Sequence, residues 1–115
     1  MGTCLEDTYW FLSNKANKNE YTIIHAIVER QSDNLRHPHS VIYNKATGDI
    51  HEVSNSFKKK NVVLPFLLWI KLGKVSNIVQ YSFEEFNKNL LKNNCWDFWE
   101  LQKKGVINPV VKEHW

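Results

Sequence analysis

The chain has 115 residues, of which 43% are hydrophobic and 13% aromatic, and its formal net charge at pH 7 is +3. This length fits one domain, and the composition excludes a disordered or collagen-like chain because enough apolar side chains are present to form a core. The two cysteines are too few for a disulfide framework. We therefore expect residues 1–115 to form a single domain.

The charge and hydropathy patterns exclude two classes of partner. All but two of the 15 basic residues are lysines, and they are spread along the chain as on a solvated face, so no nucleic acid is expected. The most apolar stretch, Val62–Leu72, contains Pro65 and Lys71 and is shorter than the ~20 residues that span a bilayer. The first residues carry acids where a signal peptide carries basic residues. These features predict a cytoplasmic protein with no membrane partner.

A helix is predicted near the start of the chain, over residues 4–14. Thr3 and Glu6 have the spacing of a capping box, and Asp7 adds negative charge to the first turn, where the helix dipole favours it. Apolar residues then recur at helical spacing. Cys4 lies in the opening turn of this predicted helix.

The next segments are predicted to form strands. Residues 21–29 are rich in β-branched side chains and indicate a strand buried on both faces. The polar residues 30–38 indicate a loop. Residues 39–43 and 50–54 are two alternating runs separated by a segment with Asn, Gly and Asp, which is typical of a hairpin.

The second half of the chain alternates between helical and strand-like segments. Residues 62–72 favour a helix that begins near Pro65, and residues 75–81 favour a short strand. Residues 82–85 form a second capping box, and residues 95–101 predict a short helix. The helix after the capping box is expected to have one apolar face, formed by Phe83, Phe86, Leu90 and Leu91. The whole pattern predicts an α+β fold in which an N-terminal helix packs on a small antiparallel sheet.

Cys4 is a candidate nucleophile because of its position. The start of a helix has unpaired backbone N–H groups and the positive end of the dipole, and both favour the thiolate, which is the reactive form of cysteine. The alternative is that Cys4 is a small buried hydrophobic residue.

The predicted hairpin supplies a base for such a nucleophile. If residues 45–48 form a four-residue turn, His39 and Glu52 become diagonal neighbours on one face of the hairpin. Their Cβ atoms would then be roughly 7 Å apart or less, a distance that an imidazole and a carboxylate can bridge. A slip of one residue would instead put His51 beside His39. Taken singly, His39 and Glu52 could also be ordinary surface groups of a hairpin.

Several short motifs, in this order, resemble small papain-like proteins of phages and bacteria. Such proteins begin with a Gly-x-Cys helix, matched by Gly2–Asp7, which is followed by an aliphatic-His-small strand, matched by Ile24–Ala26. A His-small-aliphatic strand and an acidic segment come next, matched by His39–Ile42 and His51–Asn55. The similarity touches most of the chain, and its late motifs are residues 81–85 and 94–97.

The resemblance implies a minimal papain-like core and a cysteine hydrolase or acyl-transfer enzyme, such as a peptidase or deamidase, that acts on a protein or peptide without a cofactor. It implies Cys4 as the nucleophile, His39 as the general base and acid, and Glu52 as the acceptor that orients the imidazole. Thr3 and His25 are candidates for contacting the substrate or supporting these residues. For His25 the simpler alternative is a hydrogen-bonded histidine in the core.

A zinc site is a second hypothesis for the histidines. His37, His39 and His51 together could offer three imidazoles to a catalytic zinc ion. The predicted register, however, turns His51 to the face opposite His39, and no zinc-binding motif is present. No metal is therefore expected.

The alternative function from another class is a phage or mobile-element protein that binds a host protein and performs no chemistry. Three residues precede Cys4 in this sequence, so no counterpart is expected for the upstream glutamine that stabilises the oxyanion in papain. Tryptophans near the C-terminus could form a binding surface, although they could equally close the core: Trp96, Trp99 and Trp115.

Overall fold

The computed structural model describes residues 4–29, 34–53, 62–93 and 97–105, without the side chain of Cys4. The elements, in chain order, are α1 (Cys4–Ser13), the short 3-10 helix η1 (Lys18–Glu20), β1 (Tyr21–Glu29), β2 (Arg36–Asn44), β3 (Asp49–Glu52), β4 (Val62–Pro65), α2 (Phe66–Gly73), β5 (Ser76–Tyr81), α3 (Phe83–Asn93) and α4 (Trp99–Lys103). None of the helices in these ranges is long and apolar enough to cross a membrane.

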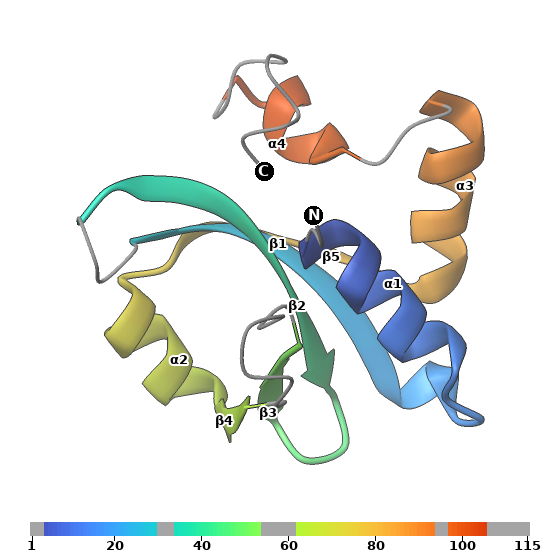
Figure 1. The fold of residues 1–115 in the computed structure, drawn as a ribbon, viewed down its shortest axis with the longest axis horizontal. Helices are drawn as coiled ribbons and strands as arrows, with labels where there is room; N and C mark the ends of the chain where they lie inside the picture. Colours follow the sequence, from blue (N-terminus) through green and yellow to red (C-terminus); the bar gives the residue numbers. More distant parts are fainter. Residues whose placement is uncertain (1–3, 30–33, 54–61, 94–96, 106–115) are drawn as a thin grey trace.

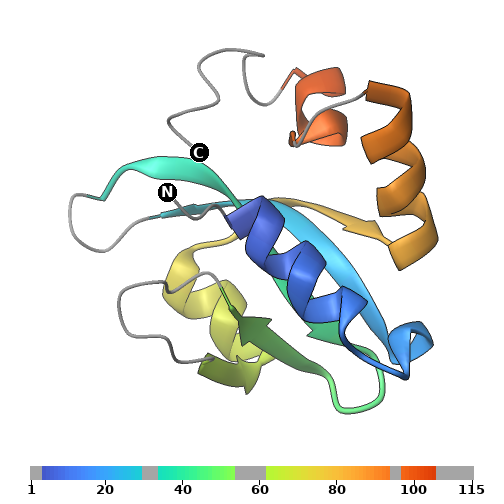
Figure 2. The same cartoon turned by 45° about the vertical axis from the view of Figure 1, so that its right-hand side comes forward.

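The centre of the molecule is an antiparallel sheet of five strands in the order β4-β3-β2-β1-β5. Helices α1, α3 and α4 lie on one face and α2 lies on the other (Figures 1 and 2). The predicted α+β fold, with an N-terminal helix packed on a small antiparallel sheet, is confirmed.

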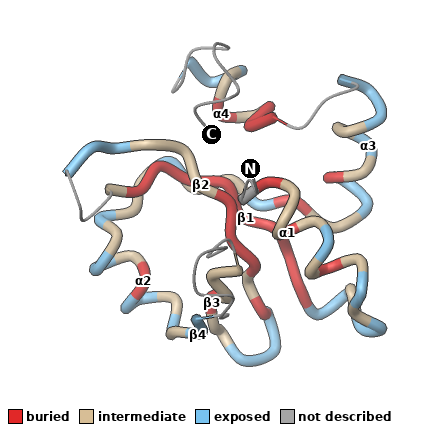
Figure 3. Tube along the Cα trace, viewed as in Figure 1, coloured by how far each residue is buried: buried red, intermediate tan, exposed pale blue. Residues whose placement is uncertain are grey.

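Strand β1 is buried along almost its whole length, as its β-branched sequence predicts (Figure 3). Because side chains alternate along a strand, Ile23 packs with Leu12 and Phe86 on the α1 and α3 face. Ile24 packs with Trp69 on the α2 face. The sheet therefore separates two apolar clusters, one on each face. Strand β2, the neighbour of β1, contributes one of its faces to each cluster.

The hairpin between β2 and β3 has the predicted register. Asn44 pairs with Asp49 and Tyr43 with Ile50, so that residues 45–48 form the connecting turn. Gly48 has a φ of 79°, a backbone conformation that glycine adopts without steric cost. The second strand is shorter than predicted, since β3 ends at Glu52, and Ser54 lies outside the described residues.

Two segment predictions are wrong in part. Strand β2 begins at Arg36, inside the predicted loop, and Pro38 lies opposite Ile27 of β1. A proline is tolerated there because β3 pairs only farther along β2, at residues 42–44. The helix predicted to begin near Pro65 is confirmed as α2, but residues 62–65 of the same segment form strand β4, since the β-branched Val62 and Val63 pair with β3.

The predicted capping box of α3 is confirmed. The Ser82 hydroxyl accepts a hydrogen bond from the Glu85 N–H at 3.0 Å, and the Glu85 carboxylate accepts one from the Ser82 N–H at 2.8 Å. Phe86 is buried, but Leu91 is 83% exposed and does not belong to the apolar face. Leu90 faces the core, and a neighbour one residue along a helix is turned about 100° away.

The helices predicted near the two ends of the chain are both present, as α1 and α4. Helix α1 ends at Ser13, close to the predicted boundary. The predicted capping residue Thr3 lies outside the described residues. The short helix predicted over residues 95–101 is α4, which begins four residues later, at Trp99. Cys95 lies outside the described part of the chain.

Candidate active site

His39 and Glu52 meet on the α2 face of the sheet. The Nε2 atom of His39 lies 2.6 Å from Oε1 of Glu52, and 15% and 25% of the two side chains are exposed. His39 comes from β2 and Glu52 from β3, and the observed hairpin register makes them the diagonal neighbours that the sequence predicts. The expected contact between these two side chains is confirmed.

The second oxygen of the Glu52 carboxylate is held by Trp69 from α2. The indole N–H donates a hydrogen bond to Oε2 at 3.1 Å. Burial by itself raises the pKa of Glu52, but the hydrogen bond and the positive charge of His39, together with the Trp69 hydrogen bond, lower the pKa below its usual value. Glu52 is therefore held as a carboxylate with both oxygens bound.

A cavity of about 260 Å³ lies beside this pair. Its walls are mostly apolar, and they come from all of β1, β2, β3, β4 and α2. The residues that line it are Val28, Glu29, His37, His39, Glu52, Leu64, Trp69, Leu72 and Gly73. A site that combines a hydrogen-bonded imidazole and carboxylate with an apolar cavity is a common arrangement for a binding or catalytic centre.

The three histidines proposed for zinc do not come together. The rings of His37 and His39 lie 5.9 Å apart, but His51 is on the other face, between Phe11 at 5.6 Å and Tyr21 at 6.0 Å. Burial and the nearby Lys15 lower the pKa of His51. Within the described residues no group of three or more His, Cys, Asp or Glu side chains could hold a metal ion.

Helix α1, which begins at Cys4, is fixed to β2 next to His39. The hydroxyl groups of Thr8 and Ser40 lie 2.8 Å apart and are buried. Cys4 precedes Thr8 by one helical turn, and Ser40 follows His39 in β2. The first turns of α1 therefore lie against the strand that carries His39. The side chain of Cys4 lies outside the described part of the structure.

The sheet nevertheless lies between α1 and the cavity. Ser40 faces α1 and His39 faces α2, because consecutive side chains of a strand point to opposite faces. Among the described residues, β3 pairs with β2 only at residues 42–44. A group at the start of α1 would have to pass the edge of β2 to meet the imidazole.

His25 is fully buried on the α1 face and does not line the cavity. Its ring packs against those of Tyr81 and Phe98, each at 4.8 Å, and within the described residues neither ring nitrogen has a hydrogen-bond partner. The prediction of a core position is confirmed, but the prediction that the ring is hydrogen-bonded is wrong. Burial, with a smaller contribution from His39, lowers the pKa of His25 to about 3.

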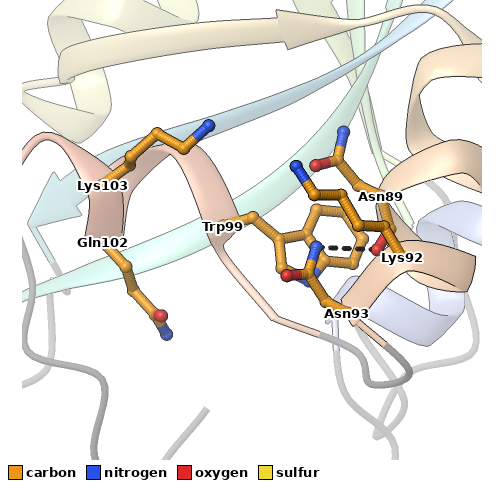
Figure 4. Close-up of a pocket in the computed structure, with 6 residues that line it drawn as sticks. All are labelled: Asn89, Lys92, Asn93, Trp99, Gln102 and Lys103. Atoms are coloured by element: carbon orange, nitrogen blue, oxygen red, sulfur yellow. Dashed lines mark hydrogen bonds between the residues drawn. The ribbon is translucent and has the colours of Figure 1, made fainter.

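A second cavity, of about 330 Å³, lies between α3 and α4 (Figure 4). Its lining consists of Asn89, Lys92, Asn93, Trp99, Gln102 and Lys103. Among the described residues its lining contains no imidazole and no carboxylate, so the His39–Glu52 pair beside α2 is the better candidate for chemistry.

Trp99 is buried in the core, whereas Trp96 and Trp115 lie outside the described residues.

Sequence reasoning missed Trp69. Its place on α2 was predicted, but no local pattern relates a tryptophan to a carboxylate 17 residues earlier in the chain. The contact arises because α2 folds back over the end of β3.

Comparison with protein-family models, with curated proteins and with solved structures gave no match to this chain.

Proposed function

We propose that this protein is a papain-like thiol enzyme that hydrolyses or transfers an acyl group of a protein or peptide. The observation that carries the proposal is the 2.6 Å contact between His39 Nε2 and Glu52 Oε1. Helix α1, which begins at Cys4, contacts β2 at Ser40, the residue after His39. Nucleophile, base and orienting acid also follow one another along the sequence as in papain-like enzymes.

In the proposed reaction, Cys4 first transfers its thiol proton to His39. Because Nε2 contacts Glu52, the proton is exchanged at Nδ1, the other ring nitrogen. The thiolate attacks the carbonyl carbon of an amide, and the new C–S bond gives a tetrahedral oxyanion. Backbone N–H groups in the first turn of α1 are the expected donors to that oxyanion.

The intermediate then collapses to a thioester. The C–N bond breaks while His39 gives its proton to the departing nitrogen, so that an amine leaves. In the second half of the reaction His39 takes a proton from water or from an acceptor amine, which attacks the thioester and releases Cys4. Water gives hydrolysis or deamidation, and an amine gives acyl transfer.

Glu52 and Trp69 act through His39 in this scheme. The carboxylate accepts a hydrogen bond from the Nε2–H group and stabilises the imidazolium, as the third residue of a triad does. Trp69 is a positioning residue, since its bond to Oε2 leaves Oε1 directed at His39. Both depend on the close packing of α2 against β3 and β4.

The proposal is tested by measuring the rate of Cys4 alkylation with iodoacetamide as a function of pH. The Cys95→Ser variant is used so that Cys4 is the single thiol. We expect the rate to follow a pKa clearly below the ~8.5 of free cysteine, and we expect His39→Ala to restore an ordinary profile. A midpoint near ~8.5 in the Cys95→Ser variant would overturn the proposal.

A second measurement separates this enzyme from the non-catalytic alternative. The biological effect of the protein is compared between wild type and Cys4→Ala, with Cys95→Ala as the matched control. Loss of the effect in Cys4→Ala alone supports chemistry at this residue. A full effect in both variants favours a protein that acts only by binding.

A further inference from the structure

A second candidate binding site is the cavity of about 330 Å³ between α3 and α4. Its volume is at the lower end of the ~300–1,000 Å³ range of small-molecule sites, so it has room for one small ligand. Figure 4 shows the Trp99 ring at this cavity, beside side chains of α3. The other described residues that line it are all polar: Asn89, Lys92, Asn93, Gln102 and Lys103.

The feature of this cavity that points to a ligand is the indole N–H of Trp99. This residue is only 7% exposed, and its Nε1 atom has no hydrogen-bond partner among the described residues. Buried donors in folded proteins are bonded in the large majority of cases, because an unmade bond costs the desolvation of the group. Since Nε1 is shielded from solvent, an acceptor reaches it when an exposed side chain of the lining, such as Asn93, turns aside. An oxygen atom of a ligand in the cavity would satisfy this donor.

The charge of the lining favours an anionic group. In the described part of the chain no carboxylate lines the cavity. Lys103 contacts Glu100 at 3.4 Å, whereas Lys92 forms no ion pair with a described residue. Lys92 also lies in the last turn of α3, where the helix dipole by itself favours a cation. The lysines therefore indicate the sign of the ligand charge, and the unbonded Trp99 donor indicates that a ligand binds.

The amide side chains of the lining offer hydrogen-bond acceptors. Nδ2 of Asn89 donates to the Glu85 carbonyl oxygen at 2.9 Å, and Nδ2 of Asn93 donates to that of Asn89 at 2.8 Å. Nε2 of Gln102 donates to Oδ1 of Asp97. The three amide nitrogens are thus bonded to the protein, and the three amide oxygens have no donor among the described residues. Hydroxyl groups of a ligand are donors that such oxygens accept.

We infer that this cavity binds a small molecule that carries both an anionic group and several hydroxyl groups, as a sugar phosphate or a sugar acid does. The anionic group accepts hydrogen bonds from the Trp99 indole and from Lys92, and the hydroxyl groups donate to the amide oxygens of the lining. The proposed enzyme site is a different cavity, lined by His39 and Glu52. This inference therefore goes beyond the proposed function and does not depend on it.

Three simpler ligands match the lining less well. An inorganic anion would bind Lys92 and Trp99 but would leave the amide oxygens without donors. A neutral sugar would bind the amides but would leave the lysine ammonium groups without a counter-charge. A divalent cation would bind the amide oxygens but would be repelled by Lys92 and Lys103. A hydroxylated anion satisfies the charge, the indole donor and the amide acceptors together.

The inference is tested by recording the tryptophan indole N–H signals of the isotope-labelled protein by NMR. The signal of Trp99 is identified by its loss in Trp99→Phe, and that of Trp69, whose N–H binds Glu52, by its loss in Trp69→Phe. The probes are glucose-6-phosphate, glucuronate, glucose and inorganic phosphate, each titrated separately. We expect one or both of the anionic sugars to shift the Trp99 signal with saturation and to leave the Trp69 signal in place. Glucose and inorganic phosphate should each bind about tenfold more weakly or worse.

Two pairs of variants locate the binding site. Lys92→Gln removes the ammonium group and should weaken binding of the anionic sugar about tenfold or more. Lys88→Gln, one turn earlier on α3 and outside this lining, is the matched control and should not change the affinity. Asn89→Ala removes an amide oxygen and should weaken binding about fivefold, with Asn87→Ala as its control. None of these four side chains is buried, so the variants are expected to fold, and their NMR spectra verify it.

Several results would overturn the inference. Neither anionic sugar shifts the Trp99 signal, or glucose binds as tightly as they do, or Lys92→Gln binds as tightly as wild type. Inorganic phosphate that binds as tightly as the sugars would mean an adventitious ion only. A response to one anionic sugar and not to the other supports the inference and identifies the anionic group as a phosphate or a carboxylate.

Discussion

The hydroxyl groups of Thr8 and Ser40 lie 2.8 Å apart in the interior, and this contact joins α1 to β2 one residue beyond His39. The Thr8 hydroxyl also donates to the carbonyl oxygen of Leu5 at 3.0 Å. Ser40 is therefore the donor to Thr8. The position of the first turn of α1 relative to the imidazole depends on this pair.

Removal of the Thr8 hydroxyl should destabilise the protein more than removal of the Ser40 hydroxyl. Thr8→Val leaves the buried Ser40 hydroxyl without its acceptor, and we expect a loss of about 1–3 kcal/mol in the free energy of unfolding. Ser40→Ala leaves Thr8 bonded to Leu5, so the loss should be about 1 kcal/mol. Urea unfolding measures both, and equal losses would contradict the assigned donor direction.

The role of Trp69 is tested by Trp69→Phe. The phenyl ring keeps most of the apolar contacts but cannot donate to Oε2 of Glu52, so one of the interactions that lower the pKa of this carboxyl is lost. We expect the acid limb of the Cys4 alkylation profile to move to higher pH. Trp99→Phe, in the other cluster, is the control. A profile unchanged by Trp69→Phe would show that Trp69 is only a packing residue.

Substitutions at Glu52 should separate hydrogen bonding from charge. Glu52→Gln retains an oxygen that can accept from Nε2, whereas Glu52→Ala removes the acceptor. We expect alkylation of Cys4 at neutral pH to be fastest in wild type, slower in Glu52→Gln and slowest in Glu52→Ala, because papain-like triads function with an amide as the third member. Equal rates in Gln and Ala variants would mean that Glu52 does not orient His39.

A cross-linking experiment measures whether Cys4 reaches His39 past the edge of β2. In the double variant His39→Cys and Cys95→Ser, the thiols at positions 4 and 39 should be joined within one chain by dibromobimane, a reagent that spans two nearby thiols. Position 43 lies four residues away on the same face of β2, so Tyr43→Cys with Cys95→Ser is the control and should react more slowly. Failure of the first pair to cross-link would exclude a shared catalytic site.

Burial of His25 should make the protein sensitive to acid. Its pKa is about 3 in the folded protein and 6.5 in an unfolded chain, so below pH 6.5 the unfolded state takes up a proton that the folded state does not. Stability is therefore lost as the pH falls from 6.5 towards 3. His25→Phe removes this titration, and at pH 5 we expect it to reduce the acid-induced loss by about 2 kcal/mol.

The comparison uses thermal or urea unfolding at pH 7.5 and pH 5. At pH 7.5 His25→Phe should be as stable as wild type or more stable, because it removes two buried nitrogens that have no partner among the described residues. His51→Phe, which changes a histidine only partly buried on the same face, is the control. The same pH dependence in wild type and His25→Phe would refute the assignment.

The sequence alone determined the features that depend on neighbouring residues. The capping box at Ser82 and Glu85 and the register of the β2–β3 hairpin follow from patterns a few residues long. Once the register is known, alternation of side chains brings His39 to Glu52. This half of the candidate site is local in origin, and for that reason it was predictable.

Only the tertiary structure decided what surrounds that pair. The sequence does not indicate that α2 covers one face and places Trp69 on Glu52, nor that α1 lies on the other face, across the sheet from His39. It also does not reveal that the ring of His25 is buried without a partner among the described residues. Such relationships depend on which helix packs on which face of the sheet. Burial of apolar residues that are far apart in the sequence determines this packing, and no local sequence pattern encodes it.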